Sequence, residues 1–263
     1  MEDRAVVITG GGSGIGQAVA LLCAEREARV AVLDLRNDEA EHTAEESLRR
    51  GAKRAIGLQC DVGIESEVES ALARCRQELG GLSRIFANAG VELNGSTHEM
   101  PYETWNRVMT TNLTGVFLTC KHSLRAMVED GEGGAIVCTS SPAAFVGFAG
   151  GGNGPYAASK GGVSALVRTL ALDYAPYDIR VNAVVPGATD TPMMWAGFPA
   201  AEREAARRDV EQKAKNEIPL GRLARPEEPA QAVLWLLSDE SSYVTGSHLV
   251  CDGGILAKSP NTF

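Results

Sequence analysis

A tyrosine and a lysine four residues apart, Tyr156 and Lys160, have the residue types and the spacing of an acid/base pair. Pro155 favours a helix start beside them, and residues i and i+4 of a helix lie one turn apart on the same face. A nearby ammonium favours a phenolate and lowers the phenol pKa from its usual value of about 10. By itself this spacing is more often ordinary helix surface. Evidence that this pair is catalytic therefore has to come from other parts of the chain.

A glycine-rich turn follows the first apolar run of the chain. The β-branched residues 5–9 lead into TGGGSGIG over residues 9–16, and an amphipathic segment comes next. Strand, glycine turn and helix in this order bind a dinucleotide pyrophosphate. Gly10 permits the tight turn, Gly14 lets the backbone approach the phosphates, and Gly16 lets the helix pack closely on the strand. The spacing differs from the commonest fingerprint, so the turn alone is weak evidence.

Asp34 ends the second strand-like segment, 18 residues after Gly16. A carboxylate there accepts hydrogen bonds from the adenosine ribose hydroxyls and repels a 2′-phosphate. The alternative is a solvated carboxylate at a strand end. Arg36 lies two residues further on and is a possible partner for a 2′-phosphate, but Leu35 separates the two, so we predict NAD rather than NADP.

The composition excludes several classes of partner. The chain has 263 residues, 44% hydrophobic and 22% charged, with a formal net charge of -9, which argues against nucleic acid. Its apolar runs are far shorter than a membrane span, and its first residues show no signal-peptide pattern. We expect a cytoplasmic protein that has neither nucleic acid nor a membrane as partner.

Neither disulfides nor a metal site are expected. Six cysteines are scattered without a C-x-x-C pair, and four histidines lack any ligand spacing. Free, buried thiols are the better interpretation.

Strand-like and helical segments alternate along the chain, which predicts an α/β fold. We expect a three-layer, doubly wound (Rossmann) parallel sheet with helices on both faces, in a single domain over residues 1–263. Ligands of such sheets bind beyond the carboxyl ends of the strands. Asp61 and the turn Asn88–Gly90 both fall at such ends.

Two helical segments depart from a regular pattern. The segment 102–128 contains Asn112 and Gly115, which are poor formers of helix interiors, so a local irregularity is expected near Asn112. Residues 192–218 show no sheet pattern, and we interpret them as a helical substrate lid. The alternative is a surface helix with methionines that face the core.

With these pieces in one order, the sequence resembles the short-chain dehydrogenase/reductase family in its compact single-domain branch. The resemblance extends from Thr9 to Gly254. It rests on the motif T-G-x-x-x-G-x-G, Asp34, the pair 61–62, N-A-G, Asn112, the serine pair 140–141, Y-x-x-x-K and P-G. It implies an NAD-dependent oxidoreductase that interconverts a secondary alcohol and a ketone by hydride transfer.

The resemblance also implies roles for single residues. Tyr156 would be the general acid/base, Lys160 would lower its pKa and hold the nicotinamide ribose, and Ser141 would bind the substrate oxygen. The backbone of Asn112 would hold a water molecule in a proton relay. The cofactor-binding positions it implies are Gly10, Ser13, Gly14, Ile15, Gly16, Asp34, Asp61, Val62, Asn88, Ala89, Gly90, Tyr156, Lys160, Pro186, Gly187, Thr189 and Thr191.

The chain departs from the family pattern near the expected substrate pocket. Tyr156 follows Ser141 by 15 residues, about two more than the family suggests, and the extra length lies in the glycine-rich loop 147–154. Cys138 replaces a frequent asparagine, and Thr189 replaces a usual aliphatic residue. We expect the pocket to draw on Ala143, Phe145, Gly150–Gly152, Met193, Met194 and Trp195, with Arg203, Arg207 and Arg208 within possible reach of a substrate carboxylate.

Two alternatives are an NADP-dependent 3-oxoacyl-carrier-protein reductase, which Asp34 disfavours, and a dinucleotide-binding sensor without turnover. The family resemblance further suggests a homotetramer that pairs the helices Tyr102–Val128 and Tyr156–Ala175. The expected substrate is a small alcohol or ketone.

Overall fold

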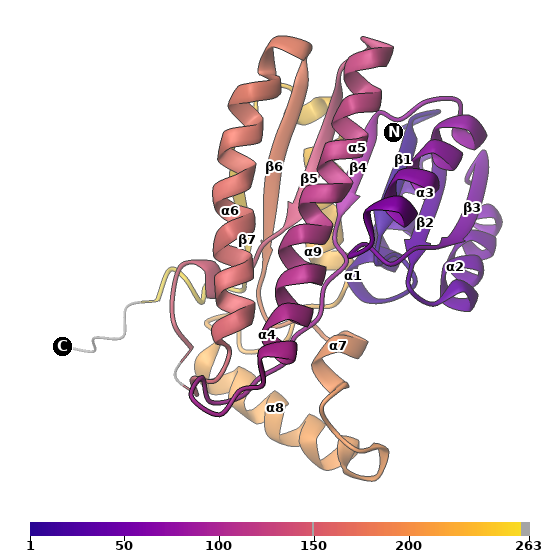
Figure 1. Ribbon diagram of the computed structural model, residues 1–263. Helices are drawn as coiled ribbons and strands as arrows, with labels where there is room; N and C mark the ends of the chain where they lie inside the picture. The colour runs from indigo at the N-terminus through magenta and orange to yellow at the C-terminus, as the bar shows by residue number, and fades with distance from the viewer. Residues whose placement is uncertain (149, 259–263) are drawn as a thin grey trace.

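The structure is a computed structural model that describes residues 1–148 and 150–258. Its centre is one sheet of seven parallel strands in the order β3-β2-β1-β4-β5-β6-β7 (Figure 1). The predicted doubly wound parallel sheet is confirmed. The strands are β1 (Ala5–Thr9), β2 (Arg29–Asp34), β3 (Arg54–Gln59), β4 (Arg84–Ala87), β5 (Gly134–Thr139), β6 (Ile179–Pro186) and β7 (His248–Cys251).

Helices cover both faces of this sheet. On one face, α1 (Gly14–Ala24), α2 (Asn37–Arg49) and α9 (Glu227–Leu237) pack on an apolar cluster that contains Val19 and Val233. On the other face lie α3 (Glu65–Leu79), α5 (Gly115–Asp130) and α6 (Gly154–Tyr174), over a second cluster. The central strands are therefore buried on both sides, which explains why their sequences are almost continuously apolar.

Three further helices lie at the carboxyl end of the sheet, where Figure 1 shows α4, α7 and α8 together. They are α4 (Tyr102–Met109), α7 (Pro192–Trp195) and α8 (Arg203–Glu217). Short 3₁₀ turns occupy Pro142–Ala144, Ala175–Tyr177, Ala200–Glu202 and Asp239–Ser241. No helix among the described residues has the length and apolar character needed to cross a membrane.

The expected irregularity at Asn112 is confirmed. Between α4 and α5 the chain forms one π-helical turn over Thr110–Thr114. Gly115 follows that turn, and a Cβ atom on it would lie 2.6 Å from Val62 Cγ2. The glycine thus allows α5 to approach the segment that follows β3.

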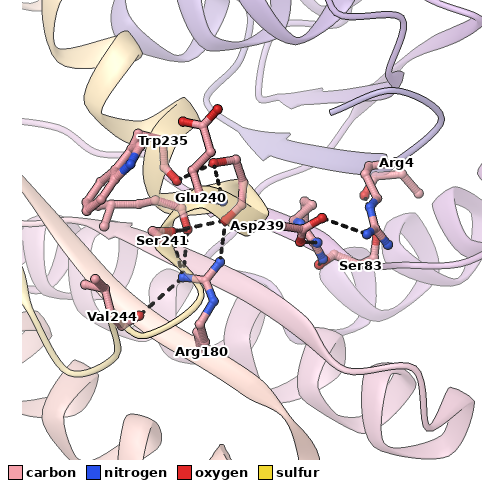
Figure 2. Close-up of polar contacts among 12 residues, drawn as sticks. Arg4, Ser83, Arg180, Trp235, Asp239, Glu240, Ser241 and Val244 are labelled. Carbon is pink, nitrogen blue, oxygen red and sulfur yellow. Dashed lines mark hydrogen bonds and ion pairs between the residues drawn. The ribbon is translucent and has the colours of Figure 1, made fainter.

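A network of arginines fastens the opposite end of the sheet (Figure 2). Arg180 of β6 donates from Nη1 to the carbonyls of Leu236 (3.0 Å) and Val244 (3.2 Å) and from Nη2 to the carbonyl of Ser238 (2.9 Å). It also binds Ser241 Oγ at 2.9 Å. Leu236 and Ser238 lie at the carboxyl end of α9, where helix carbonyls lack intrahelical partners and a cation is favourable.

Replacing Arg180 with methionine should lower the free energy of unfolding by about 2–4 kcal/mol, because it leaves buried carbonyls without donors. Urea unfolding followed by circular dichroism measures this change. The matched control is Arg225→Met, whose side chain is 76% exposed. Equal stabilities of the two variants would contradict the role given to Arg180.

Candidate active site

A cavity of about 1230 Å³ opens at the carboxyl ends of the parallel strands. It lies where β1 and β4 are neighbours and the winding of the chain reverses direction, the usual ligand position in such sheets. The predicted cofactor positions that line it are Gly10, Ser13, Gly14, Ile15, Asp34, Asp61, Val62, Asn88, Ala89, Gly90, Tyr156, Lys160, Pro186, Gly187, Thr189 and Thr191.

The glycine turn forms one wall of the cavity. Gly10 and Gly14 have φ angles of +61° and +55°, which side chains rarely adopt. A Cβ atom on Gly16 would lie 2.2 Å from the carbonyl oxygen of Gly10, so this glycine lies behind the wall and keeps α1 close to the turn. Thr191 packs against Gly14, since a Cβ there would meet it at 3.2 Å. The amino end of α1 therefore faces the cavity.

Hydrogen bonds join the ends of β1, β4 and β5. Thr9 Oγ1 accepts from the backbone N–H groups of Asn88 (3.0 Å) and Ala89 (3.2 Å). Asn88 Nδ2 donates to the carbonyls of Thr9 and Gly10, and its Oδ1 accepts from Thr139 Oγ1. Sequence analysis missed the structural roles of Thr9 and Thr139, although each stands at the end of a strand.

Asp34 lies at the cavity edge and is oriented by backbone donors. Its Oδ2 accepts from the N–H of Gly12 at 2.9 Å and its Oδ1 from the N–H of Arg36 at 3.1 Å. The guanidinium of Arg36 pairs with Glu39 instead of facing the cavity unpaired. The charge presented at this edge is therefore that of the carboxylate.

Tyr156, Ser141 and Lys160 share another wall of the cavity. The Lys160 Nζ atom is 5.6 Å from the centre of the Tyr156 ring and donates to the carbonyl of Thr139 at 2.8 Å. The helix start at Gly154–Pro155 and the strand end at Thr139 place the three side chains together. Of the loop 147–154 that precedes Tyr156, residue 149 lies outside the described residues.

The expected lowering of the Tyr156 pKa is not found in the structure. The pKa of the Tyr156 phenol is raised to about 12, chiefly by burial and to a smaller extent by the charge of Glu92, against a lowering by the hydrogen bond from Ser141. Burial also lowers the pKa of Lys160 to about 8. Both groups are desolvated, which disfavours either charge. Tyr156 is half-buried and lines the cavity, so a bound ligand will change its desolvation and with it the pKa.

Asn112 holds the turn after β4 from within the π-helical segment. Its Nδ2 donates to the carbonyl of Val91 and its Oδ1 accepts from the N–H of Val91, both at 2.8 Å. The side chain is fully buried and also donates to Ser159 Oγ at 3.3 Å. Its side chain therefore fixes the backbone beside the cavity, while the proposed water contact of its backbone stays a prediction.

The substrate end of the cavity differs from the expected pocket. Met193 and Met194 line it as predicted, but Ala143, Phe145, Gly150–Gly152 and Trp195 do not. Phe145 packs edge-on against His248, and Trp195 is buried. The apolar lining that the sequence did not indicate includes Leu93, Pro142, Phe148 and Phe198. These residues lie in loops and short turns, whose side-chain directions no periodic pattern reveals.

The three arginines expected near a substrate carboxylate do not line the cavity. Arg207 of α8 makes two hydrogen bonds to Asp190, at 2.9 and 3.2 Å, and lies 4.8 Å from the centre of the Trp195 ring. The Trp195 Nε1 donates to the same carboxylate at 2.7 Å. Arg203 donates to the carbonyl of Phe198. Arg207 is thus occupied in holding α8 to the chain before α7.

No cluster of three or more potential metal ligands occurs in the part of the chain that the structure describes. The glycine turn, the Asp34 carboxylate at the cavity edge and the Tyr156 phenol fit a nicotinamide dinucleotide, because the positive φ angles and missing side chains of the turn leave room for its phosphates.

Comparison with known proteins agrees with this geometry. The family described as "Enoyl-(Acyl carrier protein) reductase" matches residues 10–256. The chain is 43% identical to cis-4-hydroxycyclohexanecarboxylate dehydrogenase of Sinomonas cyclohexanicum, over 97% of each chain. It is 39% identical to 2,5-dichloro-2,5-cyclohexadiene-1,4-diol dehydrogenase of Sphingobium indicum, over 98% of each.

Solved structures are similar over the same extent. A short-chain type dehydrogenase/reductase from Mycobacterium marinum superposes with a TM-score of 0.90 at 36% identity, covering 98% of this chain and 97% of that one. Levodione reductase superposes with a TM-score of 0.92 at 33% identity, covering 98% and 100%.

The buried charge of Lys160 should reduce stability in a pH-dependent way. Its pKa of about 8 in the folded protein lies below the value of about 10.4 for an unfolded lysine, so the unfolded chain binds more protons between these values. Below pH 8 the penalty is complete, at about 3 kcal/mol, and it disappears as the pH rises to about 10.4. Lys160→Met should therefore be more stable than wild type at pH 7 by about 2 kcal/mol, after the lost Thr139 bond is subtracted.

Urea unfolding at pH 7, 8, 9 and 10 measures this difference, with the exposed Lys213→Met as the control. The advantage of Lys160→Met should shrink with rising pH. A difference that stays constant over this range would show that the buried charge carries no such penalty.

Proposed function

The chain belongs to the short-chain dehydrogenase/reductase family, and on that premise we propose that it is an NAD-dependent oxidoreductase that interconverts a secondary alcohol and a ketone. The observation that carries the proposal is the meeting of Tyr156, Ser141 and Lys160 on one wall of a cavity whose other wall is the glycine turn. The relatives are named as dehydrogenases and reductases of alcohols and ketones.

Oxidation of a secondary alcohol removes a hydride from carbon and a proton from oxygen. A bound NAD would supply the hydride acceptor, and the residues of the protein would have to orient the hydroxyl and take its proton. Ser141 orients the oxygen by hydrogen bonding, and Tyr156 exchanges the proton. The ammonium of Lys160, fixed by the carbonyl of Thr139, favours the negative phenolate. Ketone reduction uses the same groups in reverse.

Most of the residues that would hold the dinucleotide follow the carboxyl ends of β1, β2, β3, β4 and β6. The glycine turn Gly10–Gly16 would bind the pyrophosphate, and Asp34 the adenosine ribose. Asp61 and Val62 would contact the adenine, and Asn88–Gly90 would line the cleft.

The proposal of NAD over NADP rests on Asp34. Its carboxylate is oriented by two backbone donors, and the nearby cation Arg36 is paired with Glu39. A 2′-phosphate would therefore meet a negative charge without an unpaired arginine to offset it.

Asp34→Asn keeps an oxygen for the Gly12 N–H but removes the charge. The ratio of the Kd for NADPH to the Kd for NADH should fall by roughly tenfold or more, because the repulsion of the 2′-phosphate is lost. Titration followed by nicotinamide fluorescence measures both constants. The control is Asp38→Asn, exposed on α2. Tighter binding of NADPH than NADH by the wild type would overturn the assignment of NAD.

Tyr156→Phe removes the proposed acid/base and keeps the ring. The kcat for alcohol oxidation should fall by roughly a hundredfold to ten-thousandfold, while dinucleotide binding changes little. Steady-state production of NADH measures this loss, and Tyr102→Phe, exposed on α4, is the matched control. Near wild-type turnover by Tyr156→Phe would show that another group carries the proton.

We propose a six-membered cyclic alcohol or ketone as the substrate class. The two curated relatives described above are named for hydroxylated six-membered rings. The apolar side chains of Leu93, Phe148, Met193 and Phe198 line the substrate end of the cavity and suit a carbon ring. Screening cyclic and open-chain secondary alcohols with NAD tests this class.

An NADP-dependent 3-oxoacyl-carrier-protein reductase is the second candidate, and the description of the matched family shares with it the acyl-carrier-protein substrate but not the reaction. The charge of Asp34 opposes it. A dinucleotide-binding sensor without turnover is opposed by the assembly of Tyr156, Ser141 and Lys160 at one cavity. Turnover of a 3-oxoacyl thioester with NADPH would support the reductase. Turnover of any alcohol in the screen with NAD would exclude the sensor.

We also propose that residues 192–218 act as a lid over the substrate. Met193, Met194 and Phe198 line the cavity, and Arg207 ties α8 to Asp190. Slower amide hydrogen exchange in α8 on binding of dinucleotide and substrate would support a lid, and unchanged exchange would oppose it.

We also propose that the protein is a homotetramer and that it is located in the cytoplasm. Exposed apolar side chains on α4, α5 and α6 support assembly through these helices: Tyr102 is 71%, Phe117 46% and Leu172 77% exposed.

The six cysteines are free, and all but Cys251 are buried, which suits a reducing compartment. Sedimentation as a monomer would exclude the tetramer, and recovery from a secreted fraction would exclude the location.

A further inference from the structure

Glu92 is a cavity residue that the proposed chemistry does not use. It lies two residues beyond the turn Asn88–Gly90 and lines the same cavity as Tyr156. The residue before it, Val91, is fixed by the two 2.8 Å hydrogen bonds of Asn112. Three residues after it, the N–H of Gly95 donates to the carbonyl of Gly152 at 2.8 Å. The backbone on both sides of Glu92 is therefore anchored.

The carboxylate of Glu92 has no cationic partner in the described part of the chain. Its hydrogen bond there comes from Asn94 Nδ2, at 3.3 Å, and the side chain is exposed to the cavity and to solvent. It lies close enough to the acid/base pair that its charge raises the pKa values of both Tyr156 and Lys160. An acidic group thus lines the same cavity as Tyr156 and Lys160.

The cationic side chains that line the cavity either have partners already or lie at its adenine end. Arg36 pairs with Glu39, and Lys160 donates to Thr139. Arg107 lies one helical turn before Thr110. The methyl group of Thr110 lies near Gly63, which follows the proposed adenine contacts Asp61 and Val62. Arg107 is therefore assigned to the adenine end of the cavity. Among the described residues that line the cavity, no other cationic side chain occurs.

We propose that Glu92 sets the charge preference of the site, so that the enzyme takes neutral cyclic alcohols with a second, remote hydroxyl group and disfavours hydroxycarboxylates. This inference rests on the proposed function. A carboxylate only accepts hydrogen bonds, so it binds a hydroxyl donor and repels a second carboxylate. Of the two relatives, one is named for a hydroxycarboxylate and one for a diol. Glu92 favours a substrate of the diol kind.

The test compares two ligands with the same ring, cyclohexane-1,4-diol and cis-4-hydroxycyclohexanecarboxylate. Wild type should show a kcat/KM for the diol at least roughly tenfold above that for the hydroxycarboxylate. Glu92→Gln should lower kcat/KM for the diol by roughly twofold to fivefold, because the hydrogen bond to its remote hydroxyl loses its charge assistance, and raise kcat/KM for the hydroxycarboxylate by roughly threefold to tenfold, because the repulsion is lost. Glu92→Lys should raise it further.

The matched control is Glu99→Gln, an exposed residue of the same loop that does not line the cavity. It removes the same charge from the molecule and should leave the preference of the wild type unchanged. The preference should also weaken when the salt concentration rises from about 0.02 M to about 0.5 M, since the Glu92 charge is exposed and screened.

Calorimetric binding of both ligands to the protein with NADH tests the role of Glu92 independently of the proposed alcohol oxidation. If the wild type oxidises neither ligand, the proposed ring-alcohol activity fails, and the calorimetric preference still decides the role of Glu92. Equal or tighter binding of the hydroxycarboxylate by the wild type overturns the inference. Identical effects of Glu92→Gln and Glu99→Gln overturn it as well.

Discussion

The close backbone contact between the glycine turn and the start of α1 is the constraint on which the site depends. Gly16 approaches the carbonyl of Gly10 so closely that a side chain has no room, and Asn88 donates to that same carbonyl. The contact joins the ends of β1 and β4. Through Thr139, which donates to Asn88 and accepts from Lys160, this contact extends to the wall that holds Tyr156, Ser141 and Lys160. The dinucleotide cradle and the proposed acid/base are thus parts of one hydrogen-bonded framework.

Burial in this framework disfavours a charge on either Tyr156 or Lys160, but with a pKa of about 8 Lys160 is still an ammonium at neutral pH. Tyr156 and Lys160 are both desolvated, so burial opposes the phenolate and the ammonium alike. The nearby carboxylate of Glu92 favours the ammonium and opposes the phenolate. Buried ionisable groups of this kind lower the stability of the fold and are common in active sites. The pKa values of Tyr156 and Lys160 therefore depend on what occupies the cavity.

The segment beyond β6 links the two ends of the cavity. Thr191 packs on Gly14 of the cofactor turn, while the neighbouring Asp190 holds Arg207 of α8 and the indole of Trp195. The substrate wall is therefore attached to residues that touch the cofactor wall. This connection provides a physical route by which dinucleotide binding would order the proposed lid.

The sequence alone determined the parallel α/β fold, the glycine turn, the strand-end positions and the irregular helix at Asn112, because these features depend on local periodicity and backbone preference. Tertiary structure decided the rest. The side chain of Trp195 turned out to be buried against Asp190, Arg207 was already paired, and the Tyr156 pKa was raised rather than lowered. Burial, pairing and pKa depend on which distant segments come together, and no local pattern in the sequence records that.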